Sequence, residues 1–275
     1  MNSLIKLSRP KHYIKNLLLF APLGLSLEYS VEALFNVLLG FCAFSLTASF
    51  GYIINDILDV ESDRLHHIKK SRPIASGEIS IKQALILAFI LITSGLSLGF
   101  LISIPFGFTL VAYFVLNNLY SSYLKTVKWF DVALLTSFFI IRLYAGSIAS
   151  EITISNWFIL MSIMLFLMMS IDKRYNELFH AENKRRAYRD ADIEILLTYR
   201  SSLLIAVLVC LNLYMNDMNA SGLIRVLITL LSYVQLTTML EKKEEDQVSK
   251  ILNPKFLGLA ILLAVLYIAM KLNLL

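Results

Sequence analysis

The sequence predicts an all-α, polytopic membrane protein with about nine transmembrane helices and a cytoplasmic N-terminus. Hydrophobic residues make up 57% of the chain and charged residues only 16%, with a mean hydropathy of +0.69. The apolar residues are gathered in blocks about long enough to cross a bilayer, and the basic residues lie in alternate connections between those blocks. We therefore expect residues 1–275 to form a single transmembrane domain.

Each apolar block is expected to form one membrane-spanning helix. The seventh block is short and contains Asn212, so its ends are the least well defined. Residues 1–15 lack the apolar core of a cleavable signal peptide, which favours the first block as a true span. In order, the blocks are residues 14–29, 34–54, 83–101, 104–119, 132–150, 157–171, 203–214, 223–240 and 256–270.

The distribution of positive charge sets the expected orientation. Of the 25 Lys and Arg residues, 22 lie in alternate connections that fall on one side of a nine-span chain. By the positive-inside rule, the N-terminus and the connection after the second block are cytoplasmic, and the C-terminus is outside. This topology accounts for the net charge of +5, so nucleic-acid binding is not needed to explain it.

An acidic motif at residues 55–64 follows the second block. In a helix at about 100° per residue, Asp56 and Asp63 project in nearly the same direction, with Asp59 about 60° to one side. Such carboxylates repel each other unless a cation or a basic partner neutralises them, and carboxylate oxygens suit Mg²⁺. A solvated charged helix end is the alternative, but acidic groups beside a membrane span usually serve a function. We take Asp56, Asp59 and Asp63, with Asn55, as candidate metal ligands.

Basic residues follow this motif directly. Acids followed at once by cations suit a metal–phosphate complex, because the cations can meet phosphate oxygens that the metal leaves free. Arg64 and Arg72 are the stronger candidates, whereas Lys69 could equally be an ordinary positive-inside residue. An oxygen-rich site does not favour imidazole, so His66 is expected to contact phosphate or to lie on the surface.

Further polar residues occur in and after the later apolar blocks. Asn118 and Lys125 belong to a polar stripe that recurs at helical spacing at the end of the fourth block. Arg142 lies in the middle of the fifth block, where a cation should line a polar cavity or pair with an acid such as Asp131. Lys173 and Arg174 follow the sixth block, either as phosphate ligands or as structural anchors of the helix end.

Taken together, these motifs resemble the UbiA superfamily of intramembrane prenyltransferases. The NDxxDxxxDR pattern of residues 55–64 carries the resemblance to the superfamily. An RPKxxxKN opening at residues 9–16 and a KRxxEL segment at residues 173–178 are closest to its decaprenyl-phosphate phosphoribosyltransferase branch. Two departures are Tyr13, where tryptophan is usual, and His67, where this branch has proline.

The resemblance implies a central cavity among the helices and an active site on the cytoplasmic side of a bacterial-type plasma membrane, in cell-envelope biosynthesis. It implies Mg²⁺-dependent transfer of a 5-phosphoribosyl group from phosphoribosyl pyrophosphate to a polyprenyl phosphate, with release of pyrophosphate. The catalytic residues would be Asp56, Asp59, Asp63 and Arg142. Substrate contacts would come from Lys11, Lys15, Asn55, Arg64, His66, Lys69, Arg72, Asn118, Tyr120, Lys125, Lys173, Arg174 and Glu177.

Two other functions remain open at this point. A prenyltransferase of the same superfamily would move a prenyl group from a prenyl diphosphate to an aromatic or haem-type acceptor. Against it, the second DxxxD motif of the aromatic prenyltransferases is replaced here by Asp172, Asn176 and Glu177, with Lys173 and Arg174 between them. A transporter or lipid-binding membrane protein would use the charges for a transport path, but no inverted repeat with paired broken helices is evident.

Overall fold

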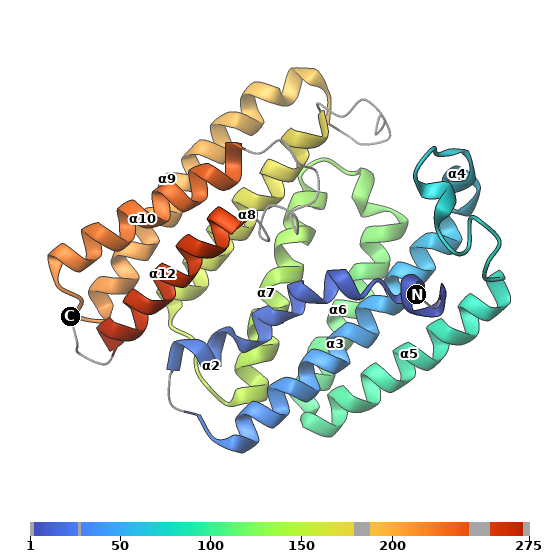
Figure 1. The fold of residues 1–275 in the computed structure, drawn as a ribbon, viewed down its shortest axis with the longest axis horizontal. Helices are drawn as coiled ribbons and strands as arrows, with labels where there is room; N and C mark the ends of the chain where they lie inside the picture. The colour runs from blue at the N-terminus through green and yellow to red at the C-terminus, as the bar shows by residue number, and fades with distance from the viewer. Residues whose placement is uncertain (1–2, 27–28, 179–187, 242–253, 272–275) are drawn as a thin grey trace. The chain divides into compact units, whose positions relative to one another are not determined.

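The computed structural model describes residues 3–26, 29–178, 188–241 and 254–271, and within them it is built from α-helices and short 3-10 segments (Figure 1). Two of the basic connections that predicted the orientation include residues 179–187 and 242–253, which lie outside the described residues. The chain forms two compact units, Met1–Leu124 with Phe138–Thr153 and Lys125–Ser137 with Ile154–Leu275. Helix α7 (Phe130–Ser150) contributes residues to both.

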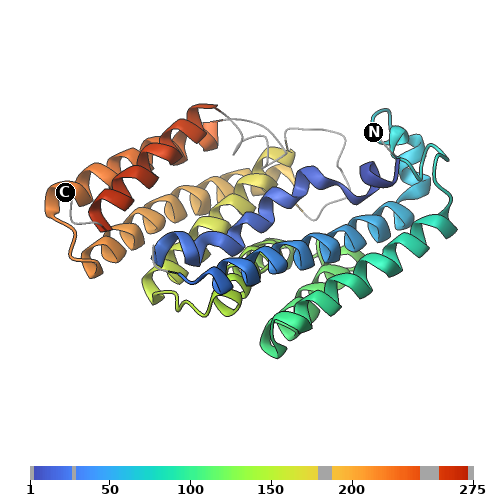
Figure 2. The same cartoon turned by 60° about the horizontal axis from the view of Figure 1, so that its bottom comes forward.

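The first unit is organised around the long helix α3 (Val31–Leu58), which packs against α5 (Ile81–Ile102), as Figures 1 and 2 both show. Serine side chains cap both helices: Ser30 accepts a hydrogen bond from the Ala33 amide at 3.0 Å, and Ser80 forms a capping box with Gln83. The remaining elements are α1 (Ser3–Ser8), η1 (Pro10–Phe20), α2 (Ala21–Ser26), α4 (Val60–Leu65), η2 (Lys69–Ser71) and α6 (Ile104–Ser122).

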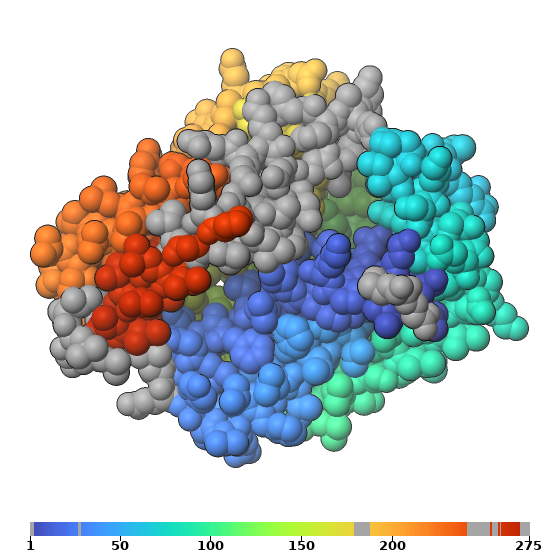
Figure 3. Space-filling view, viewed as in Figure 1, coloured from blue at the N-terminus to red at the C-terminus, as the bar shows by residue number. Residues whose placement is uncertain are grey.

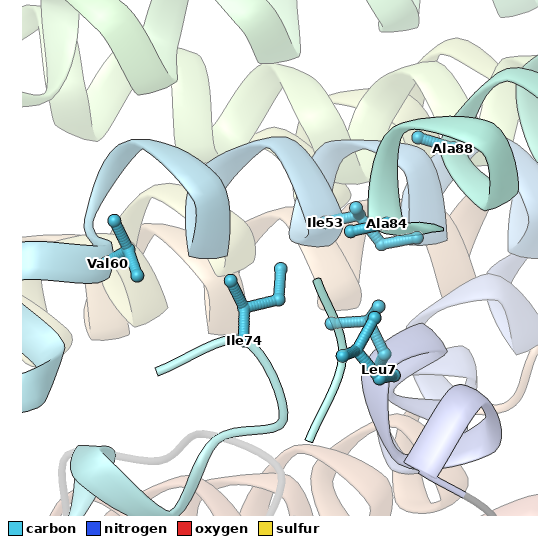
Figure 4. Packing of buried hydrophobic residues seen from close by; sticks show 7 residues of the cluster. Leu7, Ile53, Val60, Ile74, Ala84 and Ala88 are labelled. Atoms are coloured by element: carbon cyan, nitrogen blue, oxygen red, sulfur yellow. The ribbon is translucent and has the colours of Figure 1, made fainter. Parts of the chain in front are cut away.

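A buried apolar cluster fixes the segments around the end of α3. Side chains from α1, α3, α4, the following loop and α5 meet in it, so the loop after α4 is held against the helix (Figure 4). In Figure 3 the N-terminal helix lies beside the segment that follows α3, and Lys6 Nζ donates to the Ser71 carbonyl at 3.0 Å. The labelled members of the cluster are Leu7, Ile53, Val60, Ile74, Ala84 and Ala88.

A glycine sets the approach of the N-terminal segment to α7. A Cβ atom on Gly146 would lie 2.2 Å from the carbonyl oxygen of Leu19, so no other residue fits there without movement. This close contact between η1 and α7 places Asn16 of η1 beside Arg142 of α7.

The second unit pairs α8 (Asn156–Leu178) with α9 (Ile193–Asp217), α9 with α10 (Gly222–Glu241), and α10 with α12 (Pro254–Lys271). A cluster of Val132, Ile171, Tyr188 and Leu196 forms a core beside the end of α8. The short segments η3 (Leu124–Thr126) and η5 (Asp190–Asp192) precede α7 and α9.

Six helices in the described part of the chain are long and apolar enough to span a membrane. They are Val31–Leu58, Ile81–Ile102, Phe130–Ser150, Asn156–Leu178, Asp190–Asp217 and Gly222–Leu240. The total of nine spans and the orientation stay predictions. The first predicted span begins in the 3-10 segment η1 and continues in α2, where Pro22 lacks the amide hydrogen of a regular α-helical bond.

Candidate active site

The acidic motif lies at the junction of α3 and α4. Asn55 and Asp56 belong to the last turn of α3, and Asp63 belongs to α4. The expectation of one continuous helix is wrong, because the helix is interrupted at Asp59, where φ is −93° and ψ is 5°. Asp56 and Asp63 are nevertheless close enough to share a partner, and each is only 3% exposed.

Two arginines neutralise these buried carboxylates. Arg72 Nη1 donates to Asp56 Oδ1 at 3.0 Å and to Asp63 Oδ2 at 2.6 Å. Arg9 Nη2 donates to the same Asp56 oxygen. Guanidinium groups therefore supply the opposing charge that the acidic motif requires.

The backbone on either side of each arginine aims it at the acids. Arg9 has φ 52° and ψ 58°, a left-handed conformation that separates α1 from η1, and its guanidinium carbon lies 5.3 Å from the centre of the Tyr52 ring. Tyr52 precedes Asp56 by one helical turn, so the ring and the carboxylate hold Arg9 from the same face of α3. Arg72 is extended, as expected for a residue before proline. Arg72 is one of the residues that the sequence predicted to contact substrate, whereas Arg9 is not.

A cleft of about 610 Å³ opens beside the arginines. Apart from Asp56, its charged and titratable lining side chains are basic, so the cleft is suited to an anion. Of the predicted substrate residues it includes Lys11 and Arg72, while Lys6, Arg9 and His12 are additions that the sequence did not indicate. Its lining consists of Lys6, Arg9, Pro10, Lys11, His12, Asp56, Ser71, Arg72 and Pro73.

Arg142 forms a second cationic position within the same unit. Its Nε donates to Asn16 Oδ1 at 2.7 Å, its Nη1 to the Phe138 carbonyl at 2.5 Å, and its Nη2 to the Tyr113 hydroxyl at 3.0 Å. The guanidinium carbon also lies 4.7 Å from the centre of the Tyr113 ring, and the residue is 4% exposed. None of the partners recorded for Arg142 among the described residues is a carboxylate, although buried charges usually have one.

The other predicted residues of the loop after α3 are less buried. Arg64 pairs with Glu61 at 3.1 Å on an exposed face of α4. His66 Nδ1 accepts the Ile68 amide at 3.2 Å and its ring stacks on His67 at 4.9 Å, while Lys69 belongs to η2. These contacts order the loop.

Three further candidates of the first unit lie on helices outside the cleft lining. Lys15 lies in η1. On α6, Asn118 donates to the carbonyl of Phe114 at 2.7 Å, and the Tyr120 ring makes an edge contact with Phe138 at 5.7 Å.

In the second unit, Arg174 lies at the centre of a buried polar network. It is 1% exposed and pairs with Asp131 and Glu177. Tyr188 donates to Asp131 Oδ1 at 2.9 Å and accepts the Trp129 amide at 2.9 Å. Burial raises the pKa of the Tyr188 phenol, so it remains a donor at neutral pH. Because two carboxylates already neutralise Arg174, a structural role at the end of α8 is favoured over phosphate binding for this residue.

The place of the missing second DxxxD motif is also occupied by paired charges. Asp172 accepts Arg200 Nη1 at 3.1 Å and Asn176 Nδ2 at 3.0 Å, and the Arg200 guanidinium covers the Tyr175 ring at 4.7 Å. Lys173 is next along α8 and is partly exposed, and Lys125 lies in η3.

Oxygen ligands of the kind that Mg²⁺ prefers are concentrated at the α3–α4 junction. Among the described residues, no group of three or more His, Cys, Asp or Glu side chains is arranged to hold a metal ion as it stands. Asp56 and Asp63 are directed at arginines instead, so their donor chemistry fits the metal but their present partners would have to change.

Comparisons with known proteins bear on the same region. The model of the UbiA prenyltransferase family matches residues 17–256. The decaprenyl-phosphate phosphoribosyltransferase of Mycolicibacterium smegmatis is 37% identical over 187 residues, which cover 66% of this chain and 59% of that protein. The enzyme of the same name from Mycobacterium tuberculosis is 36% identical over 191 residues, 67% of this chain and 63% of that protein. The chain thus spans about three fifths of the length of these relatives.

Solved structures resemble this fold at lower sequence identity. A UbiA homologue from Archaeoglobus fulgidus, solved with DMAPP and Mg²⁺, has a TM-score of 0.73 at 17% identity, and the match covers 98% of this chain and 99% of that one. The likeness shows that the two chains share a fold.

Proposed function

Because this chain belongs to the UbiA prenyltransferase family, we propose that it is a membrane transferase that moves a 5-phosphoribosyl group from phosphoribosyl pyrophosphate to a polyprenyl phosphate. The names of the Mycolicibacterium smegmatis and Mycobacterium tuberculosis relatives support this substrate pair. Six candidate spans among the described residues support a location in the membrane, and bacterial relatives favour an inner, plasma membrane. The distribution of Lys and Arg is the basis for proposing that the active site is on the cytoplasmic side.

The observation that carries the choice of donor is the surplus of positive charge in the cleft. The positive charges of Arg9 and Arg72 are matched by the negative charges of Asp56 and Asp63. Lys6 and Lys11, which also line the cleft, add two positive charges that these two carboxylates do not neutralise. A prenyl diphosphate offers one diphosphate, whereas phosphoribosyl pyrophosphate also carries a 5-phosphate. The additional cations therefore favour the donor with the additional phosphate.

The metal would be held at the α3–α4 junction by Asp56, Asp59 and Asp63, with Asn55 as a further oxygen ligand. Mg²⁺ bound there would stabilise the negative charge that develops on the departing pyrophosphate. The Archaeoglobus fulgidus homologue was solved with Mg²⁺, which supports a divalent cation in this family.

In the proposed reaction, an oxygen of the lipid phosphate forms a bond to C1 of the ribose while the bond from C1 to the pyrophosphate oxygen breaks. The pyrophosphate leaves with the bonding electron pair. A phosphate anion is already a nucleophile, so the protein needs to orient it and no strong general base is required. Lys11, Lys15 and Arg142 are the candidates for this task in the first unit.

Arg142 is suited to bind an anion because it is buried beside neutral partners. A guanidinium presents several donors in a fixed plane, which matches phosphate oxygens. The amide of Asn16 and the phenol of Tyr113 hold that plane in place without neutralising it. We assign Arg142 to a substrate phosphate on this basis.

The remaining candidates complete the proposal. Lys125 and Lys173 of the second unit are proposed phosphate ligands, and Arg174 with Glu177 is proposed to position the end of α8 because its charge is already compensated. Arg64, His66, Lys69, Asn118 and Tyr120 stay proposed substrate contacts.

Prenyl transfer is the second candidate, because the Archaeoglobus fulgidus homologue was solved with DMAPP. The two activities are separated by offering purified protein in lipid nanodiscs either ribose-labelled phosphoribosyl pyrophosphate with a polyprenyl phosphate or labelled prenyl diphosphate with an aromatic acceptor. We expect label in the lipid phosphate with the first pair only. Label in the aromatic product alone would replace the proposal with prenyl transfer, and no product from either pair would favour a transporter or lipid-binding protein.

A further inference from the structure

We propose that Arg9 and Arg72 close the acidic site to a free divalent cation, so that the metal and a diphosphate enter as one complex. The inference rests on the proposed metal–diphosphate site and does not depend on which group the diphosphate carries. It concerns the order of ligand binding, which follows from what the two acids contact in the substrate-free protein.

The carboxylates that would bind the metal are already engaged. Asp56 accepts from both arginines, and Asp63 accepts from Arg72 at 2.6 Å. Both acids are almost fully buried, whereas Arg9 and Arg72 are 24% and 27% exposed at the cleft. Asp56 lines the cleft together with both arginines, and its Oδ1 accepts from each of them, so a cation that binds this oxygen must compete with two guanidinium groups.

A metal ion arriving alone would leave those guanidiniums without a counter-ion. Breaking a buried ion pair is strongly unfavourable when one partner remains uncompensated. The incoming cation would also be repelled by Arg9, Arg72 and the cleft lysines Lys6 and Lys11. Free Mg²⁺ should therefore bind weakly.

A metal–diphosphate complex avoids both costs because it supplies anionic oxygens for the displaced arginines. Asp56 and Asp63 can bind the metal while Arg9 and Arg72 bind the diphosphate, so each charged group keeps a partner of opposite charge. This exchange makes the two ligands bind cooperatively, and by thermodynamic linkage each raises the affinity of the other.

The arginines can change partner without leaving the site. The Tyr52 ring supports the Arg9 guanidinium at 5.3 Å independently of Asp56. The backbone after Arg72 is anchored by Pro73 and Ile74, and Ile74 is part of the buried cluster. Both guanidiniums thus remain beside the cleft when their carboxylate partners are withdrawn.

The test is a binding measurement on the full chain in nanodiscs, with Mn²⁺ as a paramagnetic substitute for Mg²⁺ and inorganic pyrophosphate as the diphosphate. Free Mn²⁺ is followed by its paramagnetic resonance signal, first with the metal alone and then with the preformed metal–pyrophosphate complex. We expect the complex to bind at least about tenfold more tightly than the metal alone, within the usual range of coupling between sites. Equal affinities would overturn the inference.

Two variants identify the residues responsible. Arg72→Gln should strengthen binding of Mn²⁺ alone and weaken its coupling to pyrophosphate, and Arg9→Gln should do the same to a smaller extent because Asp63 keeps Arg72. Lys70→Gln removes the same charge from an exposed position in the same loop and serves as the matched control. Its affinity for Mn²⁺ should equal that of the natural protein.

Thermal unfolding of each variant confirms that it is folded before its binding is interpreted. If Arg9→Gln and Arg72→Gln are folded but bind Mn²⁺ alone no better than Lys70→Gln does, the arginines do not close the site. A protein with independent metal and pyrophosphate binding that still transfers phosphoribosyl groups would contradict this inference alone. A protein with coupled binding that rejects phosphoribosyl pyrophosphate would contradict only the proposed donor.

Discussion

Replacing Arg142 by methionine removes a buried guanidinium whose described partners are an amide, a carbonyl and a phenol. Removal relieves a desolvation penalty of several kcal/mol, on the order expected for one buried ion. It also forfeits three charge-assisted hydrogen bonds at about 1.5–3 kcal/mol each. These terms oppose each other, so we expect the free energy of unfolding to stay within about 2 kcal/mol of its natural value.

Activity should respond very differently. If Arg142 binds a substrate phosphate through two hydrogen bonds, their loss raises the barrier by about 3–6 kcal/mol. That corresponds to a decrease in transfer rate of about 10²–10⁴-fold. Arg142→Lys should also lose most activity, because an ammonium group cannot reproduce the planar contacts of a guanidinium.

The assay compares thermal unfolding in detergent with the rate of labelled lipid formation. Arg225→Met is a matched control, since Arg225 also donates to an amide, Asn216 Oδ1 at 2.7 Å, but lies outside the proposed site. It should keep the natural rate. A stable, active Arg142→Lys together with an unstable Arg142→Met would show that Arg142 has a structural role, and would refute the phosphate assignment.

Four other substitutions test three separate parts of the structure. Asp56→Asn should fold but lose transfer by about 10²-fold or more, because one anionic metal ligand is gone; a near-natural rate at saturating Mg²⁺ would remove Asp56 from the metal site. Gly146→Ala should lower the melting temperature, since overpacking against Leu19 costs about 1–3 kcal/mol; an unchanged melting curve would contradict the close approach of η1 to α7. Asp131→Asn should destabilise the chain by about 3–5 kcal/mol, because Arg174 loses one of its two carboxylate partners. Tyr188→Phe should destabilise it by only about 1–2 kcal/mol, because a single phenolic donor is lost. A lower melting temperature for Tyr188→Phe than for Asp131→Asn would contradict the network.

Features that depend on local sequence were predicted well. Hydropathy located the six helices of the described residues that are long and apolar enough to span a membrane, because each carries its own apolar block. The UbiA prenyltransferase resemblance was confirmed by the family match over residues 17–256. Asp56, Asp63 and Arg72 lie within 17 consecutive residues, so their association could be anticipated from the run of acids followed by cations. The interruption of the helix at Asp59 could not be anticipated, because helical periodicity alone does not reveal a break of one residue.

Contacts between distant segments were beyond the sequence. Arg9 reaches Asp56 across 47 positions, and this contact requires the left-handed turn at Arg9 and the packing of α1 against α3. Arg142 and Asn16 are 126 positions apart and meet because Gly146 admits the backbone of η1. The Arg9-Pro10 pair did not reveal this turn, because a residue before proline is expected to be extended, whereas Arg9 is left-handed.

The most direct test of the proposed reaction is its stoichiometry. Purified protein in nanodiscs would be given Mg²⁺, ribose-labelled phosphoribosyl pyrophosphate and a polyprenyl phosphate, and both released pyrophosphate and labelled lipid would be counted. The proposed transfer predicts one pyrophosphate for each labelled lipid and neither product when the lipid phosphate is omitted. Pyrophosphate release without labelled lipid, or no release at all with both substrates present, would contradict it.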